Sequence, residues 1–192
     1  MTSAAYLSDR RVLADLIPGT LARDVSLVAG GAALTGLAAQ LSFTIPAISP
    51  VPFTLQTLAV LVTGAALGTW RGMASLALYL AVGMAGAPWF AGHTAGWQPA
   101  LFGYLIGFVV AAGVVGALAK RGADRRVWSM VALMAIGAVI IWTAGAGWLI
   151  AAQHYNLGTA ISKGVVPFVA GDAVKLAVAA LAFPAAWKLA RR

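Results

Sequence analysis

The 192-residue sequence contains no cysteine and no glutamate, and only 9% of its residues are charged. Without cysteine, the chain forms no disulfides and has no thiolate chemistry. With five aspartates as the only acidic residues, it offers few groups for acid–base catalysis. His93 and His154 are the only histidines, and the sequence contains no His-Glu-x-x-His motif for a metal. These absences argue against an enzyme.

Two other familiar signals are missing. The chain has no Gly-x-x-x-x-Gly-Lys-Ser/Thr segment, so it carries no P-loop that could bind ATP. The first twenty residues lack the basic start, apolar centre and small-residue cleavage site of a secretory leader, so no cleaved signal peptide is expected. Any energy source for work done by this chain is therefore expected to be external.

Apolar residues are what the sequence has in excess. They make up 61% of the chain, and the mean hydropathy is +0.90, which is more than one soluble domain could bury. The apolar residues form long runs without alternation, which favours membrane-spanning helices and excludes a transmembrane β-barrel. A helix needs about 20 residues to cross the hydrocarbon core, so the chain has room for about six or seven crossings.

The hydrophobic runs predict an all-α integral membrane protein, a compact bundle of six transmembrane helices. Arg71 and Gly72 make the predicted turn between the second and third helices very short. Residues 25–192 form the expected six-helix transmembrane domain, and residues 1–24 form an N-terminal cytoplasmic segment. Within that segment, residues 4–17 predict either a short interfacial helix that ends at Pro18 or a frayed tail. The predicted spans are 25–44, 54–70, 72–88, 101–119, 127–152 and 165–188.

The basic residues predict the orientation. Eleven of the thirteen lysines and arginines fall before the first span, in alternate connections, or at the chain's end. Of the other two, Lys163 lies on the opposite side and Lys175 lies inside a span. By the positive-inside rule, both termini are expected in the cytoplasm. The net charge of +8 is better explained by this topology and by anionic lipid than by nucleic acid, because no basic soluble domain is present.

Asp172 and Lys175 are the most informative residues, because they lie one helical turn apart within the last hydrophobic stretch. A charge at mid-bilayer costs about 2.5–3.5 kcal/mol, so such residues generally face a cavity, a partner or a ligand. Two interpretations remain open at this point. The pair is either an internal salt bridge between helices or a ligand-binding site.

Two further features each allow two interpretations. Ala29 and Ala33, with Ala32 and Gly36 beside them, place small residues on one face of the first span. That face either packs within the bundle or docks a separate membrane subunit.

The outer connections 45–57 and 86–97 are rich in proline, aromatic residues and glycine, and they form either an interfacial aromatic belt or lids over a ligand. Thr54 is a candidate N-cap for the helix that follows.

Four segments in this order resemble the BioY family, whose members are the substrate-capture components of energy-coupling-factor importers for biotin. The likeness runs from about residue 25 to residue 190. The segments are Val51–Val60 with Gly64 and Gly68 after it, Gly86–Gly92, Gly103–Phe108 and Pro167–Lys175.

The resemblance implies a six-helix bundle that binds biotin at its outer end, with no cofactor. It implies that Asp172 and Lys175 contact the ligand: the ureido N–H groups of biotin suit the carboxylate, and the ureido carbonyl suits the ammonium. The biotin carboxylate is a rival partner for the lysine. The other expected ligand-binding residues are Phe53, Gln56, Trp89, Phe90 and Tyr104.

The resemblance also implies partners: a membrane coupling subunit, expected to dock on Ala29 and Ala33, and two cytoplasmic ABC-type ATPases. The expected location is the bacterial plasma membrane. The alternative is a self-sufficient secondary transporter of biotin or another small carboxylate. Such a transporter would normally show inverted repeats with broken helices, and the sequence shows no convincing internal repeat.

Overall fold

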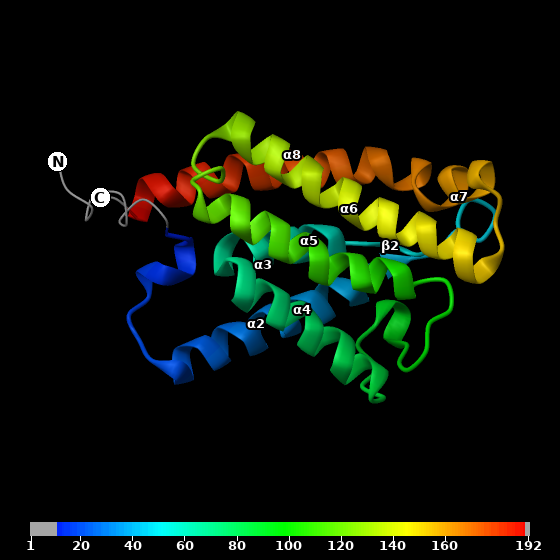
Figure 1. Ribbon diagram of the computed structural model, residues 1–192, viewed down its shortest axis with the longest axis horizontal. Helices are drawn as coiled ribbons and strands as arrows, with labels where there is room; N and C mark the ends of the chain where they lie inside the picture. The colour runs from blue at the N-terminus through cyan, green and yellow to red at the C-terminus, as the bar shows by residue number, and fades with distance from the viewer. Residues whose placement is uncertain (1–10, 191–192) are drawn as a thin grey trace.

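The computed structural model describes residues 11–190, and these form an elongated helical bundle (Figure 1). The shorter elements are the 3-10 helices η1 (Leu13–Leu16) and η2 (Ala91–His93), the two-residue strands β1 (Ser42–Phe43) and β2 (Phe53–Thr54), and α7 (Leu157–Gly164). The long helices are α2 (Leu21–Gln40), α3 (Gln56–Leu67), α4 (Thr69–Met84), α5 (Phe102–Lys120), α6 (Val127–Gln153) and α8 (Val166–Ala190).

Helix α5 lies at the centre of the bundle, where small residues let its neighbours approach closely. A Cβ atom added to Gly64 of α3 would lie 2.7 Å from the carbonyl oxygen of Ala112 in α5. Gly103 of α5 is in similarly close contact with Trp148 of α6. Backbones at this distance gain dispersion contacts along their whole length, so the glycines hold the bundle together by packing.

Contacts between connections define two ends of the bundle. At one end, Arg71 forms a 2.7 Å ion pair with Asp15, and Trp187 donates a 2.6 Å hydrogen bond to Asp124. At the other end, the Tyr104 hydroxyl donates to the carbonyl of Gly164 at 2.7 Å. The β1–β2 hairpin and α7 lie at this second end, away from the blue and red ends of the described chain (Figure 1). The described basic residues at the first end are Arg11, Arg23, Arg71, Lys120, Arg121, Arg125, Arg126 and Lys188.

Within residues 11–190, four helices are long and apolar enough to cross a membrane: α2, α5, α6, and α7 with α8 taken together. The outward faces of the bundle are apolar as well, with Leu37, Val174 and Leu181 at least 65% exposed. Such surfaces are stable against lipid rather than water. These helix lengths and apolar outer faces are those of a multi-pass membrane protein. Helix α3, at 12 residues, is only about 18 Å long.

Several predicted boundaries were wrong. The turn between α3 and α4 lies at Gly68, not at Arg71 and Gly72, because Gly68 adopts a φ of +82° that other residues rarely reach. Helix α4 ends at Met84 rather than at 88, since Gly86 has a φ of +111° and Pro88 follows it. Helix α2 begins at Leu21 and ends at Gln40, four residues earlier at each end than predicted.

The connections contain structure that the sequence did not predict. The β1–β2 hairpin pairs Ser42 with Thr54 and Phe43 with Phe53, and α7 occupies most of the expected 153–164 connection. The predicted interfacial helix at residues 4–17 lies partly outside the described residues. Its described part contains only the 3-10 turn η1. Near that turn, Val12 is fully buried against the bundle.

Candidate functional site

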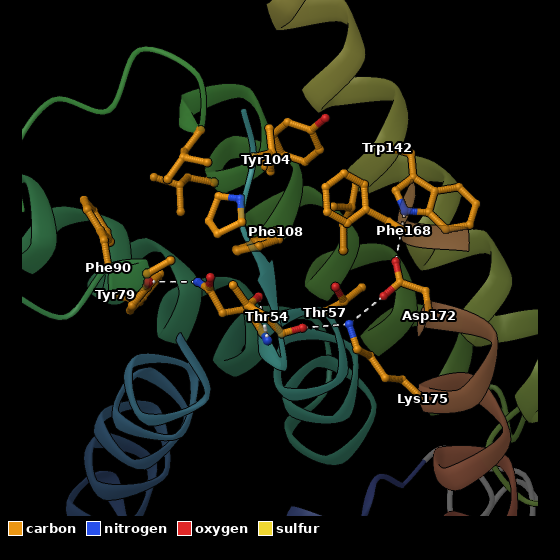
Figure 2. A pocket seen from close by; sticks show the side chains of 17 residues that line it. Thr54, Thr57, Tyr79, Phe90, Tyr104, Phe108, Trp142, Phe168, Asp172 and Lys175 are labelled. Atoms are coloured by element: carbon orange, nitrogen blue, oxygen red, sulfur yellow. Dashed lines mark hydrogen bonds and ion pairs between the residues drawn. The ribbon is translucent and has the colours of Figure 1, made fainter. Parts of the chain in front are cut away.

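A pocket opens at the end of the bundle that carries the β1–β2 hairpin. Its empty volume is about 550 Å³, including the space at its mouth. Its walls come from the segment before α3 and from α3, α4, α5, α6 and α8, so residues distant in sequence converge on it (Figure 2). The lining residues are Val51, Pro52, Thr54, Gln56, Thr57, Tyr79, Phe90, Ala91, Leu101, Tyr104, Leu105, Phe108, Ile141, Trp142, Phe168, Asp172 and Lys175.

The pair on α8 forms the polar edge of this pocket. The Lys175 ammonium lies 2.8 Å from Oδ1 of Asp172 and also donates a 2.7 Å hydrogen bond to the carbonyl oxygen of Thr54. The other Asp172 oxygen, Oδ2, accepts a 3.0 Å hydrogen bond from the indole N–H of Trp142 (Figure 2). Asp172 is only 2% exposed, and these partners offset the cost of burying its charge.

The start of α8 explains why the pair lies here. Helix α8 begins at Val166, and Pro167 lies in its first turn, where a missing N–H leaves no helical hydrogen bond unmade. The i,i+3 spacing then puts Asp172 and Lys175 on the same face, towards the pocket. Val174, by contrast, is 66% exposed on the outer side of the helix.

A second polar group lies across the pocket from the pair. The Gln56 side-chain amide donates a 2.9 Å hydrogen bond to the Tyr79 hydroxyl, and Gln56 is only 5% exposed. The Tyr79 hydroxyl donates in turn to the carbonyl of Trp89 at 3.3 Å. This chain of hydrogen bonds holds the start of α3 against α4 and leaves the amide oxygen of Gln56 as an acceptor near the pocket.

Aromatic rings supply most of the remaining wall. Phe90 packs edge-on against Tyr79, with ring centroids 5.4 Å apart, and is almost fully buried. Tyr104 and Phe168 face each other with centroids 6.4 Å apart, and Phe108 completes this side. A flat ligand with an apolar body fits such a wall, while one acidic and one basic group at the edge fix its orientation.

The chemistry of the pocket is that of binding. The described residues contain no cluster of three or more His, Asp or Glu side chains that could hold a metal ion. The carboxylate accepts hydrogen bonds and the ammonium donates them, so the pair matches a ligand that carries N–H donors next to a carbonyl or an anionic oxygen.

Comparison with known proteins agrees with this architecture. The sequence model of the BioY family matches residues 7–192, nearly the whole chain. The chain belongs to the BioY family.

Curated members of the BioY family are similar over most of their length. A protein of Pyrococcus horikoshii named a probable biotin transporter BioY is 36% identical over an alignment of 163 positions, which covers 83% of this chain and 93% of the relative. The biotin transporter BioY of Thermotoga maritima is 37% identical, covering 70% of this chain and 79% of the relative. The relatives are named as transporters, so the expectation of a transport family rather than an enzyme family is confirmed.

A solved structure has the same fold. The S-component for biotin from an ECF-type ABC transporter, whose crystal structure is known, superimposes with a TM-score of 0.77. The match covers 89% of this chain and 95% of that chain at 22% sequence identity. The predicted all-helical bundle is therefore confirmed at the level of the fold.

The structure brings five of the seven expected ligand-binding residues to the pocket, namely Asp172, Lys175, Gln56, Phe90 and Tyr104. The other two lie behind the lining. Phe53 stacks on Phe43 and packs at a tilt of 41° against the lining residue Phe168, each at a centroid distance of 5.0 Å. Trp89 packs against Tyr79 and donates its indole N–H to the Tyr79 carbonyl at 2.9 Å.

Sequence reasoning missed two of the partners of the charged pair. Trp142 lies in the middle of the apolar run of α6. Tryptophans in membrane helices are usually found at the interface, so its central position was the one signal in the sequence that could have indicated a role. The carbonyl of Thr54 gave no signal, because any residue could supply it. The Thr54 hydroxyl accepts from the N–H of Gln56 at 3.1 Å, although Leu55 rather than Thr54 is the N-cap of α3.

The small residues of α2 divide between its two sides. Ala29 and Ala33 are exposed, whereas Ala32 and Gly36 are buried within the bundle. A Cβ atom on Gly36 would lie 3.1 Å from the Trp89 ring, so this position packs internally. Ala29 and Ala33 instead form a shallow outward strip, which we call the alanine face.

Proposed function

We propose that this protein is the biotin-binding membrane component of an ECF-type importer. The observation that carries the proposal is the Asp172–Lys175 ion pair at the edge of an aromatic pocket, with an Nζ to Oδ1 distance of 2.8 Å. The names of the relatives support biotin as the ligand. Biotin is captured at the pocket end of the bundle and released to the cytoplasm when ATP is consumed elsewhere.

Biotin matches the groups that line the pocket. One of its ureido N–H groups donates to the carboxylate of Asp172, and the adjacent ureido oxygen accepts from Lys175. That oxygen takes the place of the Thr54 carbonyl, which holds the ammonium at 2.7 Å in the structure. The apolar bicyclic ring packs between Tyr104, Phe168 and Phe90, where it loses its contact with water.

We propose that the long helices cross the bacterial plasma membrane six times, with both termini in the cytoplasm. The positive-inside rule supports this orientation, because the described basic residues gather at the end that carries residues 11–20, Gly68 and the α5–α6 connection. Of the described basic residues, Lys163 of α7 and the pocket residue Lys175 lie away from that end. The pocket then faces the outside of the cell.

The partners are a membrane coupling subunit and two cytoplasmic ABC-type ATPases. The alanine face is the proposed docking surface for the coupling subunit, since Ala29 and Ala33 are exposed and let a second helix approach closely. The absence of a P-loop in the sequence supports an external energy source.

Uptake of labelled biotin in a bacterium lacking its own biotin importers tests the proposal. The chain is expressed as the wild type or as Lys175→Met, either alone or together with the coupling subunit and ATPases of the organism from which it comes. We expect uptake that depends on the module and on Lys175. Equal uptake without the module would favour a secondary transporter, and no uptake by the wild type with the module would contradict the proposal.

A further inference from the structure

The carboxylate of Asp172 is held from two sides. Lys175 on the same helix binds Oδ1, and Trp142 on α6 donates its indole N–H to Oδ2 at 3.0 Å. We propose that Trp142 is a positioning residue for the ligand, which acts by fixing the orientation of the Asp172 carboxylate. This inference rests on the proposed function, because it assumes that Asp172 accepts a hydrogen bond from a ureido N–H group of biotin.

Lys175 and Trp142 hold the Asp172 carboxylate in different ways. Lys175 is one turn away on α8 and also binds the Thr54 carbonyl, so it is shared between the carboxylate and the segment before α3. Among the described residues, Trp142 is the one side chain that donates a hydrogen bond to Oδ2. It comes from a different helix, 30 residues away in the chain, and Figure 2 shows its indole nitrogen directed at the carboxylate.

A carboxylate has about four lone-pair sites on its two oxygens. Lys175 and Trp142 each occupy one site on a different oxygen, which leaves one on each oxygen for a ligand. Because Lys175 is shared with the ligand carbonyl on binding, Trp142 is the partner that serves the carboxylate alone and keeps its plane from rotating. An acceptor that is already oriented loses less entropy when its ligand binds, and the binding is correspondingly tighter.

Trp148 provides a matched control on the same helix. It lies six residues after Trp142 and also donates its indole N–H, at 2.7 Å, but to the carbonyl of Pro99. That carbonyl keeps a second donor, Gln153 at 3.3 Å, when the indole is removed. Trp148 does not line the pocket, so Trp148→Phe removes the same chemical group without touching the Asp172 carboxylate.

The test is a double-mutant cycle on biotin affinity, measured with purified protein in detergent. Trp142→Phe should weaken binding by at least roughly tenfold, as expected for a lost hydrogen bond to a charged group. In the Asp172→Ala background, which leaves no oxygen for the indole, the same change should weaken binding less than twofold, because its effect passes through the carboxylate. Trp148→Phe should change the affinity less than twofold in either background. Trp142→His, which retains a ring N–H, should recover part of the loss.

The indole N–H signals of nitrogen-15 labelled protein give a reading that needs no ligand. The Trp142 and Trp148 signals are assigned by their loss in the two phenylalanine variants. Asp172→Asn should then shift the Trp142 signal and leave the Trp148 signal in place. An unmoved Trp142 signal, or equal effects of Trp142→Phe and Trp148→Phe on affinity, would overturn the inference while biotin binding by the wild type stands. A wild type that binds no biotin would contradict the proposed function instead.

Discussion

The side-chain ammonium of Lys175 lies 2.7 Å from the backbone carbonyl oxygen of Thr54, a residue 121 positions earlier in the chain. This bond ties α8 to the β1–β2 hairpin, whose second strand contains Thr54. The same ammonium binds Asp172. In the proposed binding mode, the ligand carbonyl competes with the Thr54 carbonyl, so occupancy of the pocket is linked to the position of the hairpin segment, residues 42–55.

Removing the ammonium should therefore loosen this segment in the ligand-free protein. A hydrogen bond to a charged group contributes about 1.5–3 kcal/mol, so amide hydrogen exchange in residues 42–55 should be at least about tenfold faster in Lys175→Met. Lys188→Met, which alters an exposed lysine at the other end of α8, is the control. Identical exchange in Lys175→Met and wild type would show that the bond does not hold the segment.

Single cysteines test the orientation, and the cysteine-free chain needs no background substitutions. Thr94→Cys and Asn156→Cys lie at exposed positions of the pocket end, and Thr20→Cys lies at an exposed position of the basic end. An impermeant thiol reagent should label the first two in intact cells and the third only after permeabilisation. The opposite pattern would place the pocket in the cytoplasm and rule out capture from outside.

The alanine face should bind a partner helix only while the side chains at positions 29 and 33 are small. Ala33→Trp should leave the biotin affinity of the isolated protein near the wild-type value but abolish co-purification with the coupling subunit, because the new ring keeps the helices apart. Val139→Trp, at an exposed position of α6, is the control and should co-purify normally. Normal co-purification of Ala33→Trp would move the docking surface elsewhere.

Asp124 in the α5–α6 connection should make stability depend on pH. It is fully buried and accepts the indole N–H of Trp187. Burial raises the pKa of Asp124, against the opposing effects of Trp187 and of the Arg125 charge. The folded state therefore binds the proton more tightly than the unfolded state. The contribution of Asp124 to stability falls as the pH rises from its pKa in the unfolded state through its higher pKa in the folded state.

Asp124→Asn keeps an oxygen acceptor for Trp187 and removes the charge. The difference in unfolding temperature between variant and wild type should therefore favour the variant increasingly as the pH rises from about 4 to neutral, when it is measured in detergent. A difference that stays constant with pH would show that the buried carboxyl does not control stability in this range.

The sequence predicted those parts of the structure that follow from hydrophobic length and from isolated charges. Each long helix overlaps its predicted span, because apolar runs of that length have few alternatives in a membrane. Asp172 and Lys175 face the pocket, as expected of charges inside a hydrophobic helix. The predicted helix ends were wrong, because they depend on the backbone conformation of glycines such as Gly68 and Gly86.

The rest of the pocket depends on contacts that no local pattern records. Trp142 and the Thr54 carbonyl reach the charged pair only because α6 and the β1–β2 hairpin pack beside α8 in the folded chain. Trp89 and Phe53 have the residue type expected of a ligand wall, yet they support the wall from behind. Residue type indicated aromatic packing near the pocket, and only tertiary structure decides which rings face the cavity.

The central claim is that Asp172 and Lys175 bind biotin, and equilibrium binding of biotin to the purified protein tests it most directly. Wild-type protein should bind, and Asp172→Asn and Lys175→Met should each bind at least tenfold more weakly, a change of about 1.4 kcal/mol. Lys188→Met should bind like the wild type. Wild-type affinity in a correctly folded Asp172→Asn variant would reduce the pair to a structural salt bridge and contradict the account.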